Sequence, residues 1–196
     1  MRPIRLVTLA VALSIVTACA TRAPAGAAET PPLLAALPER VESFEYEGFK
    51  RFEDGSEGFS VRYANARKHR LADVYVYPVA DENLELAHEA LVLGSTRATM
   101  EAIGEAVRRG VYTDLDVLDA ATRSRGPRTI ARVQATYLRQ NLASYTLLYQ
   151  TEHDGTLMKI RLSMPDNASN RANGEWDRFA ERLFDLIIAE QDGAAV

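Results

Sequence analysis

Polar and apolar residues follow two different periods along the chain from about residue 41 onward, and these periods predict its secondary structure. In the first part, aromatic and β-branched side chains recur at every second position of three short segments, a pattern typical of half-buried strands. The third segment stops at Pro78, which has no N–H to donate to a neighbouring strand. We therefore expect a three-stranded meander, with strands near residues 44–51, 59–63 and 71–77.

A helical period begins at Asp81 and continues to about Arg109. This segment predicts one long helix, or a helix that is broken near Gly94. Asp81 is a suitable N-cap, and Arg108 and Arg109 suit the C-terminal end of the helix dipole.

The rest of the chain predicts four more strands and a second long helix. Asp154 and Gly155 stand between two of these strands and are typical of a tight hairpin, which indicates antiparallel pairing. An apolar stripe of helical period then runs from Trp176 to about Gln191, with Asn173 as a suitable N-cap. The four expected strands cover residues 115–121, 129–138, 144–150 and 157–164.

The resulting order is three strands, a helix, four strands and a helix. Because the connections are short, this order predicts an α+β domain in which two main helices pack on an antiparallel sheet of about seven strands. The domain is expected over residues 41–191, with a short tail at residues 192–196. A chain of 196 residues, of which 47% are hydrophobic, has room for one such domain beside its ends.

The N-terminal segment has the features of a signal peptide. Arg2 and Arg5 give it a positive start, and the apolar stretch that follows is about ten residues long, half of what a permanent membrane span needs. The run Val16, Thr17, Ala18 and Cys19 then resembles the lipobox of bacterial lipoproteins. The alternative is an ordinary signal peptide that happens to be followed by a cysteine.

The lipobox resemblance implies that residues 1–18 are removed and that Cys19 becomes a lipidated N-terminus, carrying diacylglycerol and an acyl chain such as palmitate. Several chains on one residue give stable membrane anchoring. Ala20 is not the Asp that commonly retains lipoproteins at the inner membrane, so the resemblance implies a periplasm-facing anchor at the outer membrane of a Gram-negative cell. Residues 19–40 are rich in Ala and Pro and are expected to form a tether. Whether residues 33–37 dock on the domain stays open, as does the oligomeric state.

Charge and cysteine content exclude several functions. The chain has a formal net charge of −4, and residues 1–18 contribute two arginines and no acid, so nucleic acid is not an expected partner. Cys19 is the one cysteine of the chain, so lipidation leaves no thiol for catalysis, a metal site or an intrachain disulfide.

No motif predicts a catalytic, cofactor-binding or metal-binding residue. His88 and Glu89 lack the second histidine of a zinc-binding H-E-x-x-H helix, and we interpret His88 as a residue at the edge of the helix. Asp114, Asp116 and Asp119 form the densest group of carboxylates. A paired general acid and base is conceivable there, but a solvated strand edge is the preferred interpretation.

Two other groups of side chains allow binding. Arg123, Arg125 and Arg128 surround Gly126 and are interpreted as a solvated turn, with anion binding as the alternative. Aromatic side chains on the expected strands either line a pocket for an apolar or sugar ligand or fill the space between sheet and helix. They are Tyr75, Tyr77, Tyr137, Tyr145 and Tyr149.

The order of elements, together with Gly58 and Phe59 in an early strand and Trp176, Phe179 and Phe184 in the last helix, resembles the PsbP-like domains. The resemblance covers residues 41–191. It implies a compact domain in which helices flank an antiparallel sheet and which acts by binding, and it supplies no site residue.

The sequence thus predicts a non-catalytic binding or assembly domain, tethered to the membrane through lipid on Cys19 and meeting an envelope protein partner. The first alternative is a small-ligand carrier that uses an aromatic pocket between the sheet and the helix of residues 81–109. The second is a hydrolase that uses Asp114, Asp116 and Asp119.

Overall fold

The computed structural model describes residues 32–52 and 58–194. The expected signal peptide, Cys19 and most of the tether lie outside these residues and stay predictions. No described helix has an apolar stretch of the length needed to cross a membrane.

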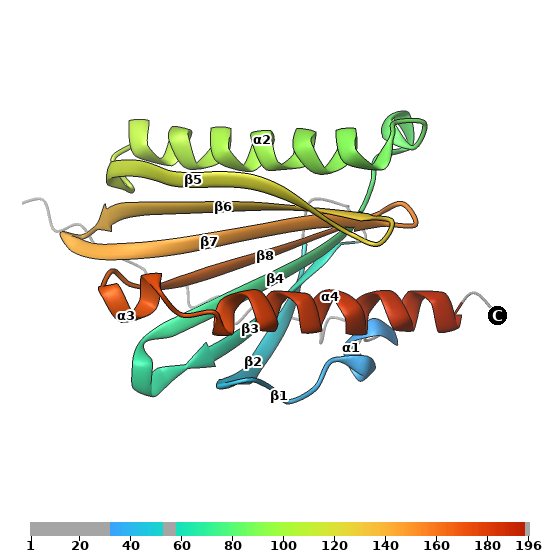
Figure 1. Ribbon diagram of the computed structural model, residues 1–196, viewed down its shortest axis with the longest axis horizontal. Helices are drawn as coiled ribbons and strands as arrows, with labels where there is room; N and C mark the ends of the chain where they lie inside the picture. The colour runs from blue at the N-terminus through green and yellow to red at the C-terminus, as the bar shows by residue number, and fades with distance from the viewer. Residues whose placement is uncertain (1–31, 53–57, 195–196) are drawn as a thin grey trace, which may run out of the picture. The chain divides into compact units, whose positions relative to one another are not determined.

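A single antiparallel sheet of eight strands forms the centre of the domain (Figure 1). Its strand order is β1-β2-β3-β4-β8-β7-β6-β5, so two meanders, each built from consecutive strands, meet where β4 pairs with β8. The predicted α+β class is confirmed, and the two-residue β1 adds one strand to the expected seven. The strands are β1 (Arg40–Val41), β2 (Phe44–Arg51), β3 (Phe59–Asn65), β4 (Arg70–Pro78), β5 (Thr113–Arg125), β6 (Arg128–Arg139), β7 (Leu142–His153) and β8 (Thr156–Pro165).

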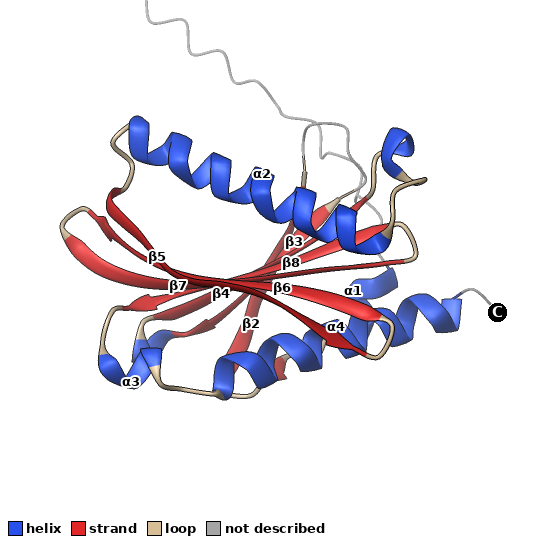
Figure 2. Cartoon of the chain, turned by 45° about the horizontal axis from the view of Figure 1, so that its top comes forward, coloured by secondary structure: helices blue, strands red, loops and turns tan. Residues whose placement is uncertain are grey.

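Two long helices cover opposite faces of this sheet and make a three-layer domain (Figure 2). α2 (His88–Arg108) lies over β5, β6 and β7, and α4 (Glu175–Ala194) lies on the other face against β1, β7 and β8. Shorter helical segments occur at α1 (Pro32–Ala36), η1 (Ala66–Lys68), η2 (Asp81–Asn83) and α3 (Ala168–Arg171).

The main hydrophobic core lies between the sheet and α4. The ring of Phe44 on β2 packs 5.9 Å from Trp176 and 4.7 Å from Phe179, and Tyr63 on β3 also contacts Phe179. Trp176 and Phe179 are at most 1% exposed, and the indole N–H of Trp176 donates to the carbonyl of Asn170 at 2.8 Å. The apolar stripe predicted from Trp176 onward is therefore the face of α4 that covers the sheet.

Residues 33–37, whose docking the sequence leaves open, pack on this core. Leu37 is 8% exposed within the core, and Leu33 and Leu34 pack against it. The carbonyl of Pro38 accepts the Tyr63 hydroxyl at 2.9 Å. The compact unit therefore begins at Pro32, ahead of the boundary expected near residue 41.

The start of α2 differs from the prediction. The sequence places it at Asp81, whereas the helix begins at His88 and Asp81 lies in the separate turn η2. The chain leaves the sheet after β4, where the Val79 N–H donates to the Gly155 carbonyl at 2.7 Å, and uses the next residues to reach the α2 layer. α2 then continues through Gly94 without a break.

The hairpins of the second meander follow the turn chemistry of the sequence. Asp154 and Gly155 both have positive φ angles, of 45° and 70°, as a tight hairpin requires. Gln140 and Asn141 adopt the same left-handed conformation between β6 and β7. Each strand of this meander extends one to four residues past its predicted ends, because pairing continues into the polar residues beside the turns.

We expect Leu37→Ala to lower the free energy of unfolding by about 2 kcal/mol, the lower end for truncation of a buried leucine, because Leu37 fills the end of the α4 core. Leu142→Ala is the matched control. Leu142 is 69% exposed, so its truncation should change stability by less than about 0.5 kcal/mol. Urea denaturation of the two variants tests this, and equal stabilities would show that the segment before β1 adds nothing to the core.

Candidate functional site

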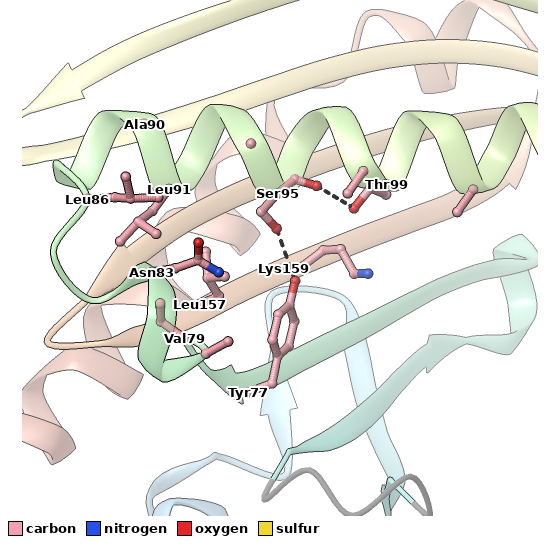
Figure 3. Close-up of a pocket in the computed structure, with 14 residues that line it drawn as sticks. Tyr77, Val79, Asn83, Leu86, Ala90, Leu91, Ser95, Thr99, Leu157 and Lys159 are labelled. Atoms are coloured by element: carbon pink, nitrogen blue, oxygen red, sulfur yellow. Dashed lines mark hydrogen bonds between the residues drawn. The ribbon is translucent and has the colours of Figure 1, made fainter.

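One side of α2 is built from small residues and borders an open space between the helix and the sheet. The buried residues of α2 are Leu91, Val92, Ile103 and Ala106, whereas the side that borders the open space carries Gly94, Ser95, Ala98, Thr99 and Ala102. Short side chains fill less of the layer between a helix and a sheet than large ones do. As a result, a pocket of about 570 Å³ lies between α2 and the ends of β4 and β8 (Figure 3).

Gly94 shows how open this space is. A Cβ atom built on Gly94 meets no heavy atom within 4 Å, although Gly94 is in the middle of the helix. Glycine in a helix interior costs roughly 1 kcal/mol relative to alanine. Gly94 is exposed and lines the pocket, and neither a positive φ angle nor close packing requires a glycine at this position, so a larger side chain here would extend into the pocket.

The pocket has an apolar and a polar end (Figure 3). Val79, Leu86, Leu91 and Leu157 line the apolar end, together with the amide side chain of Asn83. At the polar end, the Tyr77 hydroxyl on β4 lies 3.1 Å from the Ser95 hydroxyl on α2, and the Lys159 side chain passes this hydrogen bond with its ammonium pointing away from the apolar residues (Figure 3).

A smaller pocket of about 180 Å³ adjoins the polar end, with Thr99, Ala102 and Lys159 lining both. We call the two together the α2 groove. In the smaller pocket, Nη2 of Arg161 donates to the hydroxyls of Tyr112 and Tyr137 at 3.3 and 3.2 Å. The Nε atom of Arg161 is buried and has no hydrogen-bond partner among the described residues.

Lys159 and Arg161 are two cations without a carboxylate partner. Neither forms an ion pair with any residue in the described part of the chain. Asp73 is opposite Arg161 in the β4–β8 register, but its carboxylate pairs with Arg62 on β3 at 2.7 Å. Burial lowers the pKa of Lys159 below its ordinary value, and the Arg161 cation lowers it further. The Lys159 ammonium instead lies 4.4 Å from the centre of the Tyr75 ring.

On the other face of the sheet, an arginine is paired with a carboxylate of α4. Arg132 on β6 donates to Asp177 on α4 at 3.1 Å, and the Tyr149 hydroxyl donates to the same carboxylate at 2.8 Å. These groups line a pocket of about 300 Å³ between β6 and α4. The charges of Arg132 and Asp177 neutralise each other, and this ion pair links α4 to the sheet.

Arg123 and Arg125 are exposed, as a solvated turn requires, but all three arginines around Gly126 also pair with acids of α4. Arg125 contacts both Glu181 and Asp185 of α4, at 3.2 and 3.1 Å, and Arg128 contacts Asp185 at 3.0 Å. Arg123 is 3.9 Å from Asp177 of the same helix. The β5–β6 hairpin thus forms ion pairs with α4, whose acids lie more than fifty residues further along the chain.

The carboxylates considered for a hydrolase lie along the exposed edge strand β5. Asp114, Asp116 and Asp119 are all exposed, and Asp119 is engaged by Gln134 at 3.2 Å and Arg132 at 3.5 Å. Within residues 32–52 and 58–194, no group of three potential ligands could hold a metal ion. This geometry favours the strand-edge interpretation.

His88 is the first residue of α2, whereas the sequence places it seven residues into the helix. Its Nδ1 is 2.6 Å from Glu152 and its Nε2 accepts the Thr129 N–H at 2.9 Å, so the ring ties the helix to β6 and β7. His153 pairs with Asp192. Arg70 at the start of β4 is buried over the Trp176 ring, with its guanidinium 4.3 Å from the ring centre.

The structure separates the five tyrosines of the predicted aromatic pocket. Tyr75, Tyr77 and Tyr137 lie on the α2 side, beside the two cations, whereas Tyr145 and Tyr149 belong to the core under α4. Sequence reasoning missed Lys159 and Arg161. The available signal was their alternation with Met158, Ile160 and Leu162, which places both cations on one face of β8.

Comparison with known proteins supports this fold. No protein-family model matches the chain, and a search among curated proteins found no match. The solution structure of cyanobacterial PsbP from Synechocystis aligns with a TM-score of 0.51 at 14% identity, over 71% of this chain and 84% of that chain. This likeness shows the fold alone and agrees with the PsbP-like resemblance of the sequence.

Two further structures align with lower scores. A Pseudomonas aeruginosa protein of unknown function gives a TM-score of 0.39 at 6% identity, covering 72% of this chain and 83% of that one. The Saccharomyces cerevisiae Ran-binding protein Mog1p gives 0.37 at 11% identity, covering 76% and 95%. Neither alignment carries an argument.

We expect Lys159→Met to stabilise the domain by roughly 1 kcal/mol at neutral pH, because methionine keeps the length of the side chain and removes an unpaired, partly buried charge. The unfolded chain holds the Lys159 proton up to a higher pH than the folded chain does. The free energy of unfolding of the wild type should therefore rise as the pH increases from the lowered pKa toward 10.5. The difference in stability between wild type and variant should disappear over this range.

Urea denaturation at a series of pH values measures this gap. Lys68→Met is the control, because Lys68 is exposed and its replacement should change stability little at any pH. A loss of stability in Lys159→Met would mean that the ammonium has a stabilising partner in the folded domain.

Proposed function

We propose that this chain is a non-catalytic binding protein that holds a small ligand in the α2 groove and is kept at the membrane by lipid on Cys19. The observation that carries the proposal is the groove itself, an unfilled space between helix and sheet that has an apolar end and unpaired cations. It favours the small-ligand alternative over the protein-assembly role, because a groove with a defined interior suits a small molecule.

The dimensions and lining of the groove agree with those of ligand sites. Small-molecule pockets typically enclose 300–1,000 Å³ and combine apolar walls with a few polar groups that orient the ligand. The larger pocket, of about 570 Å³, has leucine and alanine walls, and Asn83, Ser95, Thr99 and Lys159 supply its polar groups together with the Tyr77 hydroxyl. No reactive pair of groups is needed for such a role.

The membrane anchor is the second part of the proposal. It rests on the run Val16, Thr17, Ala18 and Cys19 and on the short apolar stretch before it, which lie outside the described residues. Lipid on Cys19 would keep the binding domain near the outer membrane, where apolar molecules concentrate.

Binding in the groove is tested with the uncharged fluorophore N-phenyl-1-naphthylamine and the full chain. We expect its fluorescence to rise on binding, and Gly94→Leu to weaken binding by about tenfold or more, because the leucine side chain occupies the open space. Gly104→Leu is the matched control. Gly104 is also an α2 glycine with room for a side chain, but it does not line the groove. Equal binding by both variants would contradict a ligand site under α2.

The anchor is tested separately by feeding labelled palmitate to cells that express the full chain. Label should enter the wild type and not Cys19→Ala, because the lipobox resemblance assigns the acylated terminus to this cysteine. The Cys19→Ala protein should also leave the membrane fraction. Equal labelling of the two proteins would end the lipoprotein interpretation and leave the groove proposal untouched.

A further inference from the structure

Lys159 and Arg161 occupy neighbouring outward positions on one face of β8, roughly 7 Å apart. Like charges in a partly dry environment repel each other, and neither cation gains a carboxylate from the described residues in return. The same sheet pairs Arg132 fully with Asp177 on its other side. The fold can therefore neutralise a sheet cation, and at this place it does not.

Both cations line the smaller pocket at the polar end of the groove. Lys159 brings three N–H donors on an ammonium held over the Tyr75 ring, and Nε of Arg161 is buried with its donor unused. The hydroxyls of Tyr77 and Ser95 border the same end. A set of donors around two positive charges is complementary to an oxyanion, such as a carboxylate or phosphate, and charge-assisted hydrogen bonds of this kind are strong.

The opposite end of the groove is mainly apolar, so it suits an uncharged, apolar part of the same ligand. Val79, Leu86, Ala90, Leu91 and Leu157 line it. Among the described residues that line the larger pocket, Lys159 is the only charged one. A ligand that fills this pocket therefore has one negatively charged head and an uncharged, apolar body.

From this polarity we infer that the ligand is a single-chain amphiphile with an oxyanion head, whose head contacts Lys159 and Arg161 and whose chain lies along Leu86, Leu91 and Leu157. The inference rests on the proposed function and deepens it by naming the chemical class of the ligand. A cationic amphiphile would meet two like charges, and an uncharged one would leave both cations unpaired.

The experiment uses ten-carbon probes that differ only in their head groups. Decanoate, decyl phosphate, decanol and decyltrimethylammonium each compete with N-phenyl-1-naphthylamine for the full chain, and acetate and inorganic phosphate test the head without the chain. We expect decanoate or decyl phosphate to bind at least about tenfold more tightly than decanol, and acetate and phosphate to compete only weakly.

Variants connect this preference to the two cations. Lys159→Met should reduce the advantage of the anionic probes over decanol to about threefold or less, and Arg161→Gln should reduce it independently. Lys68→Met removes an exposed lysine away from the groove and should leave the advantage unchanged. Binding of decanoate should also raise the pKa of Lys159, which NMR titration of the labelled lysine side chain can follow.

Each other outcome overturns a stated part of the inference. If decanol or decyltrimethylammonium binds as tightly as decanoate, the groove takes a ligand but does not select an anion. If acetate or phosphate competes as well as the ten-carbon anions, the ligand is a small anion and not an amphiphile. If none of the probes competes although the fluorophore binds in the groove, the ligand class is wrong. If the fluorophore itself fails to bind, the proposed function fails.

Discussion

The packing of α4 on the sheet is the contact on which the rest of this domain depends. A wide antiparallel sheet has two faces to cover, and here only one of the two long helices covers its face with aromatic side chains. Phe44 and Tyr63 from the first meander, and Tyr145 and Ile160 from the second, share the core beneath Trp176 and its neighbours on α4. Burial of one large apolar side chain is worth roughly 1.5–3 kcal/mol, so this layer holds both meanders together without a disulfide.

Because one face is packed so densely, the other face can carry features that cost stability. α2 buries Leu91, Val92 and Ile103, but along the groove it carries small residues and a helix-interior glycine, and it has no phenylalanine, tyrosine or tryptophan. The cations of β8 remain unpaired there, and the tyrosines beside them supply ring faces and hydroxyls in place of carboxylates. A residue that breaks the local rules of packing or charge pairing without compensation is a candidate for function, and Lys159 is such a residue.

The sequence predicts this architecture well and the candidate site poorly, for one physical reason. Period and turn chemistry are local, so they revealed the strands, the hairpin at Gly155 and the stripe of α4. Whether Arg125 is solvated or Lys159 is paired depends on side chains that arrive from elsewhere in the chain, and so does the docking of Leu37. The start of α2 was misplaced because Asp81 has the chemistry of a cap, while the path from the sheet to the helix layer determines where the helix begins.

The strand order also has a consequence for how the domain folds. Each meander consists of contacts between neighbouring strands, but the β4–β8 pair joins residues such as Leu71 and Ser163, which are more than ninety positions apart. Because contacts between distant residues form against the entropy of loop closure, we expect this seam to form after the hairpins of each meander. Tyr75 and Tyr77 lie on one side of the seam and Lys159 and Arg161 on the other. A chain whose two halves have formed but not yet joined has most of its secondary structure and no groove.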